Sequence, residues 1–363
     1  ICTQLDNDAI VFGAEEYLSE ALAPYAAEPP PLLAIISSCA AGLIGDDIEA
    51  IARGAGLSCP IAVLDSSGLA GSFADGWDKA ACAVLSAFTP EQRSGQANAV
   101  NLIGMTSAYY NGENDAHELM RLLALAGYRV NAVLGCAMSA ADLSGLTQAS
   151  LNIVVHDELG GGAARLLAET CGTPYIAPLP PYGRAGPREW LAEIGRVLPA
   201  PCADAAQEEI TRVTREDFLR INECKSIWGE LRYDTAVIRA PRSAAWGLAQ
   251  ALRTEWADVC HLAVVAETKG AQETMGIADE ILSEMDAMRM QELLSCMEDG
   301  LLLGSSNESP HIHPQRTQYL AVSYPVQDVL QLTDNPFMGL RGARYIEETL
   351  WNGSILRRKI LLS

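Results

Sequence analysis

Short apolar stretches alternate along the chain with longer amphipathic stretches, and glycine-containing turns separate the two. "LLAIISSC" (32–39) precedes "GDDIEAIARGAG" (45–56), and "AVNLIGMTS" (99–107) precedes "NDAHELMRLLALAG" (114–127). The apolar stretches have the length and β-branched content of buried strands, and the amphipathic stretches have the period of surface helices. Strands that alternate with helices in this way predict parallel sheets covered on both faces. We therefore expect an α/β protein.

The same alternation continues over most of the chain, in the apolar stretches 60–68, 128–135, 150–157, 173–183, 234–242 and 260–267 and in the amphipathic stretches 76–88, 187–198 and 243–256. A chain of 363 residues is too long for a single compact core. Polar stretches at 89–100 and 198–209 separate groups of strands, and the second leads into a long charged helix that starts near residue 206. We predict three doubly wound parallel-sheet domains over residues 1–96, 97–205 and 206–363.

Charge and hydropathy narrow the classes of partner. The formal net charge is -21 at pH 7, which disfavours a nucleic-acid partner or an anionic membrane surface. No apolar run approaches the roughly 20 residues that span a bilayer. The first residues show no secretory signal, so we expect a cytoplasmic protein. Because the chain starts at Ile1, we expect a fragment or a mature chain with an upstream part.

Ten cysteines are scattered over the chain without any C-x-x-C pair. This spacing disfavours a zinc ribbon or a thioredoxin-like motif and predicts reduced thiols, mostly buried and inert. A cluster bound by cysteines would need ligands from distant positions or from another chain.

Cys39 ends a predicted strand just before a predicted helix. Open parallel sheets bind ligands at the carboxyl ends of their strands, and a helix N-terminus stabilises a thiolate or an anionic cluster. Asp46 and Asp47 have the ordinary role of helix caps. Spacing alone favours a buried structural cysteine over a ligand.

His156 ends another predicted strand, "LNIVVHD", at the same kind of position. A lone histidine is more often a hydrogen-bonded structural residue than a ligand. The glycines that follow, 160–162, could approach an anion, but they fit neither G-x-G-x-x-G nor the Walker pattern. A tight turn between strand and helix is the favoured interpretation.

Two further stretches carry polar residues of interest. His311 and His313 in "SPHIHPQR" could form a metal pair, although the flanking prolines favour a surface loop. The loop within 63–80 could line a cleft, or it could be a connection that ends in a helix cap at Asp75. No G-x-S-x-G elbow and no recognisable order of serine, histidine and acid supports nucleophilic hydrolysis.

The stretch "SSCAAGLIGDDIEAIA" resembles the segment around a cluster-ligating cysteine in nitrogenase component 1 proteins. The similarity continues in order along the chain, in "TQLDNDAIVFGAEEYL", "VLDSSGLAGSFADGWDKA", "LNIVVHDELGGGAARLLAETCGTPYIAPLPPYG" and "DNPFMGLRGARYIEETLWN". It covers nearly the whole chain, and C-x-x-G-L-I-G-D-D is its most specific part.

This resemblance implies a fold of three Rossmann-like domains and an oxidoreductase function. It places Cys39 where the family has a ligand of an iron–sulfur cluster, with Gly42 and Gly45 beside it. The cluster would be [4Fe–4S] or larger and shared with another subunit or with upstream cysteines. The resemblance also implies an ATP-dependent iron protein reductase as electron donor, a small-molecule substrate, and a homologous or identical subunit in a dimer or a pair of dimers.

Two departures from the family pattern argue against the function of a molybdenum nitrogenase. In molybdenum nitrogenase, the strand that matches "LNIVVHDE" carries a cysteine that anchors the active-site metal cluster, and here His156 stands in that place. The segment "YPVQDVLQLTD" lacks the histidine ligand of that cluster. We therefore expect no molybdenum–iron cofactor, and His156 becomes a candidate proton donor in the substrate cleft.

Two other functions remain open at this point. A scaffold that assembles a nitrogenase-type metal cofactor would need the same fold and the same first cluster. A metal-chelate receptor also stacks Rossmann-like domains, but it would show no iron–sulfur signal.

Overall fold

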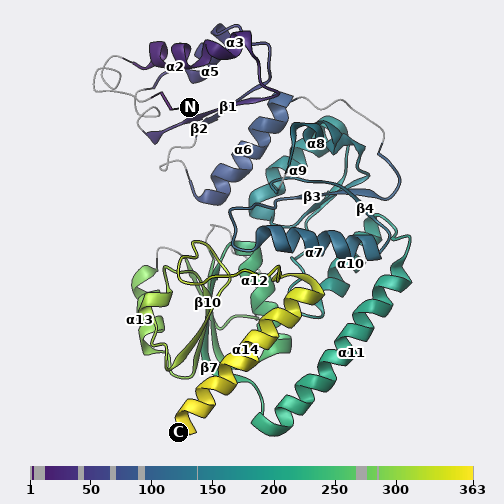
Figure 1. The fold of residues 1–363 in the computed structure, drawn as a ribbon, viewed down its shortest axis with the longest axis vertical. Helices are drawn as coiled ribbons and strands as arrows, with labels where there is room; N and C mark the ends of the chain where they lie inside the picture. Colours follow the sequence, from purple (N-terminus) through teal and green to yellow (C-terminus); the bar gives the residue numbers. More distant parts are fainter. Residues whose placement is uncertain are drawn as a thin grey trace.

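The computed structural model describes residues 2–3, 13–39, 45–65, 71–88, 95–136, 138–266, 276–283 and 286–362. Three parallel sheets follow one another along the chain, and each forms the centre of one unit. Figure 1 shows the three units stacked along the long axis, with the N-terminal end in the first and the C-terminal end beside the third.

The first unit contains a sheet of two parallel strands, β1 and β2. Its elements are α2 (Glu15–Leu22), α3 (Pro24–Ala27), β1 (Leu33–Ser37), α5 (Ile48–Gly54), β2 (Ile61–Asp65) and α6 (Phe73–Phe88). Asp47 is the N-cap of α5, since its side chain accepts a hydrogen bond from the N–H of Ala50 at 2.9 Å. Asp46 accepts instead from the N–H of Ala14 at 2.6 Å. The prediction of a cap is thus confirmed for Asp47, whereas Asp46 ties α5 to the start of α2.

The second unit has four parallel strands in the order β4-β3-β5-β6. Its elements are β3 (Ala99–Ile103), α7 (Gly112–Leu125), β4 (Arg129–Val133), α8 (Ala140–Gly145), β5 (Leu151–Val154), α9 (Asp157–Cys171), β6 (Tyr175–Ile176) and α10 (Gly186–Val197). The first-unit helix α6 packs against α9, and its Leu85 is buried with Ala163 and Leu167. This packing makes α6 part of the second unit's core as well.

The third unit has five parallel strands in the order β11-β10-β7-β8-β9. Its elements are α11 (Ala203–Trp228), β7 (Arg232–Ala240), α12 (Arg242–Ala251), a π-helical turn (Leu252–Trp256), β8 (Asp258–Ala266), β9 (Glu280–Ser283), α13 (Ala287–Cys296), β10 (Gly300–Gly304), β11 (Thr317–Ala321) and α14 (Gly339–Leu362). The first strand lies in the middle and later strands are added on both sides, which is the doubly wound arrangement.

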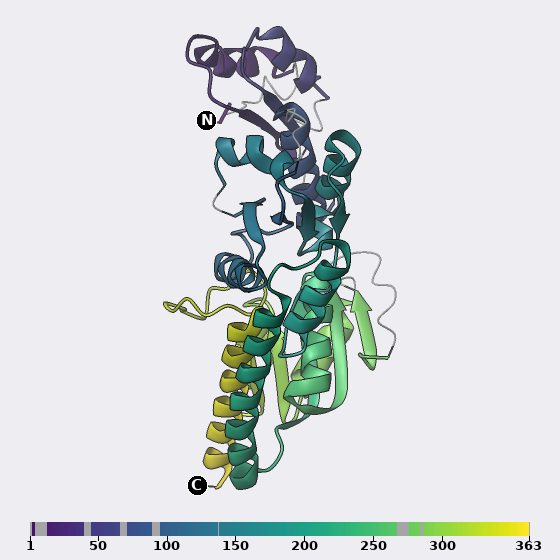
Figure 2. The ribbon, with the colours of Figure 1, turned by 90° about the vertical axis from the view of Figure 1, so that its right-hand side faces the viewer.

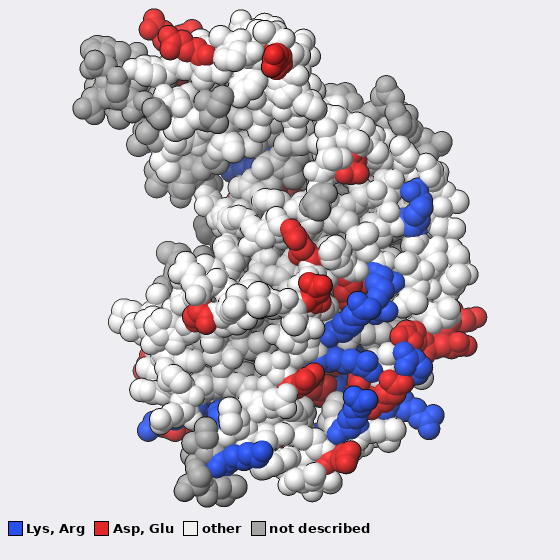
Figure 3. Space-filling view, viewed as in Figure 1, with Lys and Arg blue, Asp and Glu red and all other residues white. Residues whose placement is uncertain are grey.

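Two long helices, α11 and α14, lie side by side along the third unit (Figures 1 and 2). Leu340 of α14 is buried with Ile210 and Val213 of α11 and with Leu122 of α7 in the second unit. On the face shown in Figure 3, most charged side chains gather over these two helices, whereas the hollow between the first and third units shows few. The last helix thus joins the second and third units.

Carboxylates of α7 fix the start of α14. Asp115 accepts hydrogen bonds from the N–H groups of Phe337 at 2.6 Å and Met338 at 2.8 Å. Glu118, paired with Arg121 at 2.7 Å, accepts from the N–H of Arg341. These bonds satisfy backbone donors that a helix N-terminus leaves without partners inside the helix.

The predicted fold class is confirmed, since all strand pairs among the described residues are parallel and helices connect most successive strands. The boundaries near residues 97 and 206 remain our proposal. Among the described residues, no helix is both long and apolar enough to cross a membrane.

Two local predictions were wrong. The glycines at 160–162 lie inside α9 rather than in a turn before it. A Cβ on Gly160 would lie 2.6 Å from the N of Gly104, and one on Gly162 would lie 2.2 Å from Oδ2 of Asp78. These glycines therefore let α9 approach β3 and α6 closely.

The second local error concerns the start of α6, which begins at Phe73, earlier than predicted. The side chains of Ser72 and Asp75 form a reciprocal capping pair there, with Ser72 N–H to Asp75 Oδ2 at 2.8 Å and Asp75 N–H to Ser72 Oγ at 3.2 Å. Asp75 therefore supports the cap from the first turn of the helix.

Candidate active-site pocket

A pocket lies where the carboxyl ends of strands from the second and third units face each other. Residues that follow β3, β5, β7 and β11 line it, and the loop before α7 closes one side. Its empty volume, including the open mouth, is about 380 Å³. Doubly wound sheets bind ligands at these strand ends, so this pocket is the strongest candidate site in the described part of the chain.

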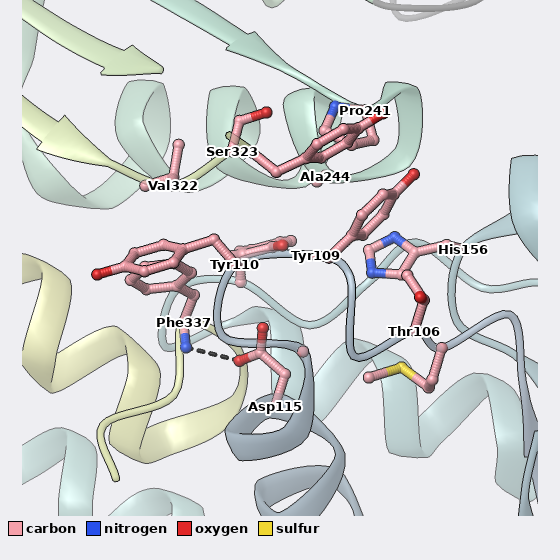
Figure 4. Close-up of a pocket in the computed structure, with 14 residues that line it drawn as sticks. Thr106, Tyr109, Tyr110, Asp115, His156, Pro241, Ala244, Val322, Ser323 and Phe337 are labelled. Carbon is pink, nitrogen blue, oxygen red and sulfur yellow. Dashed lines mark hydrogen bonds between the residues drawn. The ribbon is translucent and has the colours of Figure 1, made fainter. Parts of the chain in front are cut away.

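Aromatic rings from all three units meet at this pocket. The rings of Tyr109 and Tyr324 stack with centroids 5.4 Å apart, and Phe73 of α6 lies 5.2 Å from Tyr324. The ring of His156 meets Tyr109 edge-on at 5.3 Å. Figure 4 shows Tyr109 and His156 side by side, below Pro241 and Ala244 of the third unit. Rings in this arrangement present flat apolar surfaces, which suit a planar or apolar group.

The backbone of His156 is held by a close contact with β3. His156 follows β5 directly and precedes the first residue of α9. Gly104 follows β3 with φ at +78°, and a Cβ there would lie 2.4 Å from the carbonyl oxygen of His156. Only glycine fits this approach without strain, so the two strand ends lie close enough to share one pocket.

The imidazole of His156 is part of a buried hydrogen-bonded chain. Its Nδ1 lies 2.6 Å from Oγ of Ser243, and that hydroxyl donates to Oε1 of Glu158 at 2.9 Å. Burial lowers the pKa of His156, and the charge of Glu158 opposes this shift only in part. The neutral imidazole is therefore the resting form near neutral pH.

A second contact joins the same two units beside this chain. Arg242 pairs with Asp157 at 2.8 Å, next to the contacts between Ser243 and Glu158. The first turn of α9 therefore faces the first turn of α12 across the pocket wall.

Asp115 lies at the side of the pocket opposite Pro241 (Figure 4). Burial raises its pKa to about 7, although the two N–H groups of Phe337 and Met338 act in the other direction. Both N–H groups bond to Oδ1, so Oδ2 is left to carry a proton. Asp115 is thus a buried carboxyl that changes charge near neutral pH.

Cys39 lies two residues beyond β1, and it is exposed rather than buried in the core. Gly45, which has φ at +80°, precedes α5, and a Cβ there would meet nothing within 4 Å, whereas Gly42 lies outside the described residues. In the part of the chain that the structure describes, no three His, Cys, Asp or Glu side chains come together as a metal site. One exposed thiol at a strand end fits a cluster that is shared with ligands from elsewhere, because iron–sulfur clusters need several thiolates.

The expectation that the cysteines are mostly buried was wrong. Five are exposed, Cys2, Cys39, Cys202, Cys260 and Cys296, and only Cys136 and Cys171 are buried. Burial raises the pKa of Cys136 to about 12 and that of Cys82 to about 11. Several thiols lie on amphipathic helices and strand ends, where composition alone does not tell the inner from the outer face.

These thiols should differ in their rate of alkylation. Iodoacetamide at pH 8 is expected to modify Cys260 and Cys296 at least tenfold faster than Cys136, because only the thiolate reacts and Cys136 is both buried and protonated. Peptide mapping by mass spectrometry measures each rate. Equal rates in native protein would contradict the described burial, and equal rates after denaturation serve as the control.

The histidines of the predicted surface loop stay at the surface. His311 and His313 are exposed beside a short 3₁₀ turn, Ser309–His311. They are not part of a metal-binding group among the described residues, so the surface-loop interpretation is the better one.

Sequence reasoning identified one residue of this pocket, His156, from its position at a strand end. It missed Tyr109, Asp115, Ser243 and Tyr324, which the fold brings to the same place. The same rule of strand ends could have found Ser243, since it follows the predicted strand 234–242. No signal in the sequence pairs it with His156, which is 87 residues away.

Comparison with known proteins agrees with this architecture. Residues 1–353 match the family model described as nitrogenase component 1 type oxidoreductase. The solved structure "Nitrogenase Cp1 at pH 6.5" superposes with a TM-score of 0.78 at 15% identity, covering 97% of this chain and 82% of that one. A second, "Nitrogenase Cp1 at pH 5", gives 0.74 at 19% identity and covers 97% and 76%.

Sequence relatives include one kind of subunit of light-independent protochlorophyllide reductase, from several bacteria. The protein of Synechococcus sp. (strain JA-3-3Ab) is 24% identical over 355 residues, which cover 91% of this chain and 68% of that protein. The protein of Rhodopseudomonas palustris (strain TIE-1) is 28% identical over 211 residues, which cover 54% and 39%. The protein of Chloroflexus aurantiacus (strain ATCC 29364 / DSM 637 / Y-400-fl) is 23% identical over 337 residues, which cover 89% of this chain and 61% of that protein. The matches therefore span about two fifths to two thirds of these relatives' length.

Three parallel-sheet units, with a pocket where strand ends of the second and third face each other, define an α/β protein with a candidate ligand site between two units. With a family model matched over nearly its whole length, the chain belongs to the nitrogenase component 1 type oxidoreductases. The resemblance seen in the sequence is thereby confirmed, and members of this family generally bind iron–sulfur clusters.

Proposed function

We propose that this chain is a nitrogenase-like reductase subunit that reduces a small molecule in the pocket beside His156. Cys39 would hold part of an iron–sulfur cluster, which would accept electrons from an ATP-dependent iron–sulfur reductase. The observation that carries the proposal is the pocket itself, at facing strand ends of two sheets, in a chain of an oxidoreductase family.

The cysteine ligands available in this chain support a cluster that is shared with other ligands. Cys39 supplies one exposed thiolate, and a homologous or identical subunit, or cysteines upstream of Ile1, would supply the others. The cluster, when bound, supplies electrons one at a time. His156 replaces the cysteine that would anchor a molybdenum–iron cofactor, which supports a reductase without that group.

The pocket residues have separate tasks in this proposal. The rings of Tyr109 and Tyr324 hold a planar apolar part of the substrate and exclude water. Asp115 and His156 are two buried titratable groups on the pocket wall, and both are placed to move a proton when the substrate takes up electrons.

Removal of the Cys39 thiol tests the proposed cluster. In anaerobically purified protein with its partner subunit, Cys39→Ala is expected to remove most of the iron, the acid-labile sulfide and the visible cluster absorption. Cys296→Ala removes another exposed thiol, at the end of α13, and should leave all three unchanged.

Undiminished iron in Cys39→Ala would contradict the ligand assignment. A loaded complex that takes up electrons from the reductase but turns over no substrate would favour the alternative role, a scaffold for assembly of a nitrogenase-type metal cofactor.

A further inference from the structure

The geometry around His156 constrains where its proton lies. A serine hydroxyl carries one proton, and a carboxylate can only accept hydrogen bonds. Ser243 Oγ lies 2.9 Å from Oε1 of Glu158 and 2.6 Å from Nδ1 of His156. If the hydroxyl proton goes to the carboxylate, the bond to the imidazole must be donated by His156.

Glu158 is a buried hydrogen-bond acceptor between α9 and α12. Its side chain is 3% exposed and lies in the first turn of α9. It also faces the first turn of α12, where the backbone N–H of Ser243 donates to Oε1 at 3.2 Å. The backbone N–H and the hydroxyl of Ser243 thus both donate to Oε1 of Glu158. The hydroxyl of Ser243 therefore has a strong acceptor on one side.

The other ring nitrogen of His156 has a different environment. Figure 4 shows one nitrogen of the ring toward Pro241 and Ala244 of the third unit and the other toward the pocket. Among the described residues, Nε2 makes no hydrogen bond, whereas Nδ1 is bonded to Ser243. The partner of one imidazole nitrogen fixes the state of the other.

We propose that Ser243 and Glu158 are positioning residues that hold His156 as the neutral Nδ1–H tautomer, so that Nε2 offers a lone pair to the pocket. This inference rests on the proposed function in one respect only, namely that the pocket is the site where the substrate binds. A ligand that enters the pocket then meets a hydrogen-bond acceptor at His156, and the imidazole takes up a proton there before it can give one. His156, predicted as a proton donor, can therefore donate from Nε2 only after that nitrogen has been protonated.

Nitrogen NMR of the full chain labelled with ¹⁵N-histidine tests the tautomer directly, because protonated and unprotonated ring nitrogens have well-separated shifts. The chain has five histidines, and the His156 signals are those lost in His156→Gln. We expect a protonated Nδ1 and an unprotonated Nε2 in the wild-type protein. Ser243→Ala removes the acceptor, and its His156 should change to the Nε2–H form, with loss of the protonated Nδ1 signal.

Two further variants separate positioning from general disruption. Ser243→Thr keeps a hydroxyl and should restore the Nδ1–H form. Asp157→Ala breaks the neighbouring ion pair with Arg242 between the same two helices and should leave the tautomer unchanged.

A wild-type His156 in the Nε2–H form, or one whose tautomer is the same in Ser243→Ala, would overturn the inference. The measurement needs no cluster, reductase or turnover, so failure of the proposed function would appear in the iron analysis and leave this result standing.

Discussion

Asp115→Ala is expected to lower the free energy of unfolding by about 2–6 kcal/mol, since each buried N–H group left without an acceptor costs roughly 1–3 kcal/mol. The two N–H groups are those of Phe337 and Met338, which bond to Oδ1 of Asp115 at 2.6 and 2.8 Å. Asp115 is 4% exposed, so water cannot easily replace it. Urea unfolding followed by tryptophan fluorescence measures the change.

Asp115→Asn should behave quite differently from the alanine variant. Its amide oxygen can accept both N–H groups as Oδ1 does, and its NH₂ takes the place of the protonated Oδ2. We therefore expect a loss below about 1.5 kcal/mol, the size of one ordinary hydrogen bond.

The pH dependence of the difference between wild type and Asp115→Asn has a definite sign. The pKa of Asp115 is raised from 3.8 to about 7, so between these values the folded state binds a proton that the unfolded state has released. The wild type therefore loses stability relative to Asp115→Asn as pH rises from about 4 to about 7, and the difference levels off above that range. Glu113→Ala, on the exposed side of the same helix, is the control and should change stability little. If the wild type became more stable relative to Asp115→Asn as the pH rises, the assignment of a buried, protonated carboxyl to Asp115 would be contradicted.

Gly135→Ala should be the most damaging glycine substitution near the pocket. Gly135 has φ at +106°, and a Cβ there would lie 1.8 Å from the carbonyl oxygen of Met105. Backbone strain and overpacking each cost roughly 1–3 kcal/mol, so a loss of about 2–6 kcal/mol is expected. Because Met105 lines the pocket, ligand binding should weaken as well.

Gly195→Ala is the matched control for this substitution. Gly195 lies in α10, and a Cβ there would meet nothing within 4 Å. We expect it to raise the free energy of unfolding by about 0.4–1 kcal/mol, because alanine restricts the unfolded chain. Thermal or urea unfolding compares the two variants, and equal effects would contradict the close approach at Gly135.

The strands were the most predictable part of the fold. The apolar stretches 99–107 and 150–157 become β3 and β5, because a buried parallel strand needs a continuous apolar run. The short strand β10, "GLLLG", was not predicted, and neither was the course of α14. The place of α14 depends on carboxylates of α7 some 220 residues earlier, a contact that no local pattern contains.

The site was predictable only one residue at a time. The strand-end rule leads to His156, but hydrogen bonds between units decide its chemistry, and these depend on how α9 and α12 face each other. For the three glycines of α9, by contrast, the sequence pattern suggested a turn or a binding loop, neither of which the structure forms there. Their composition resembles an anion loop, yet the carboxylate of Asp78 accepts the N–H of Gly162 at 3.0 Å inside a helix.

The contact between α7 and the start of α14 has a consequence for synthesis on the ribosome. With the boundary proposed near residue 205, the second unit is complete in sequence long before Phe337 and Met338, whose backbone N–H groups donate to Asp115. Until those residues leave the exit tunnel, one face of α7 stays uncovered while the third unit is still being made. We therefore expect the nascent chain to complete its second unit only together with the third, with apolar surface of α7 exposed to chaperones during that interval.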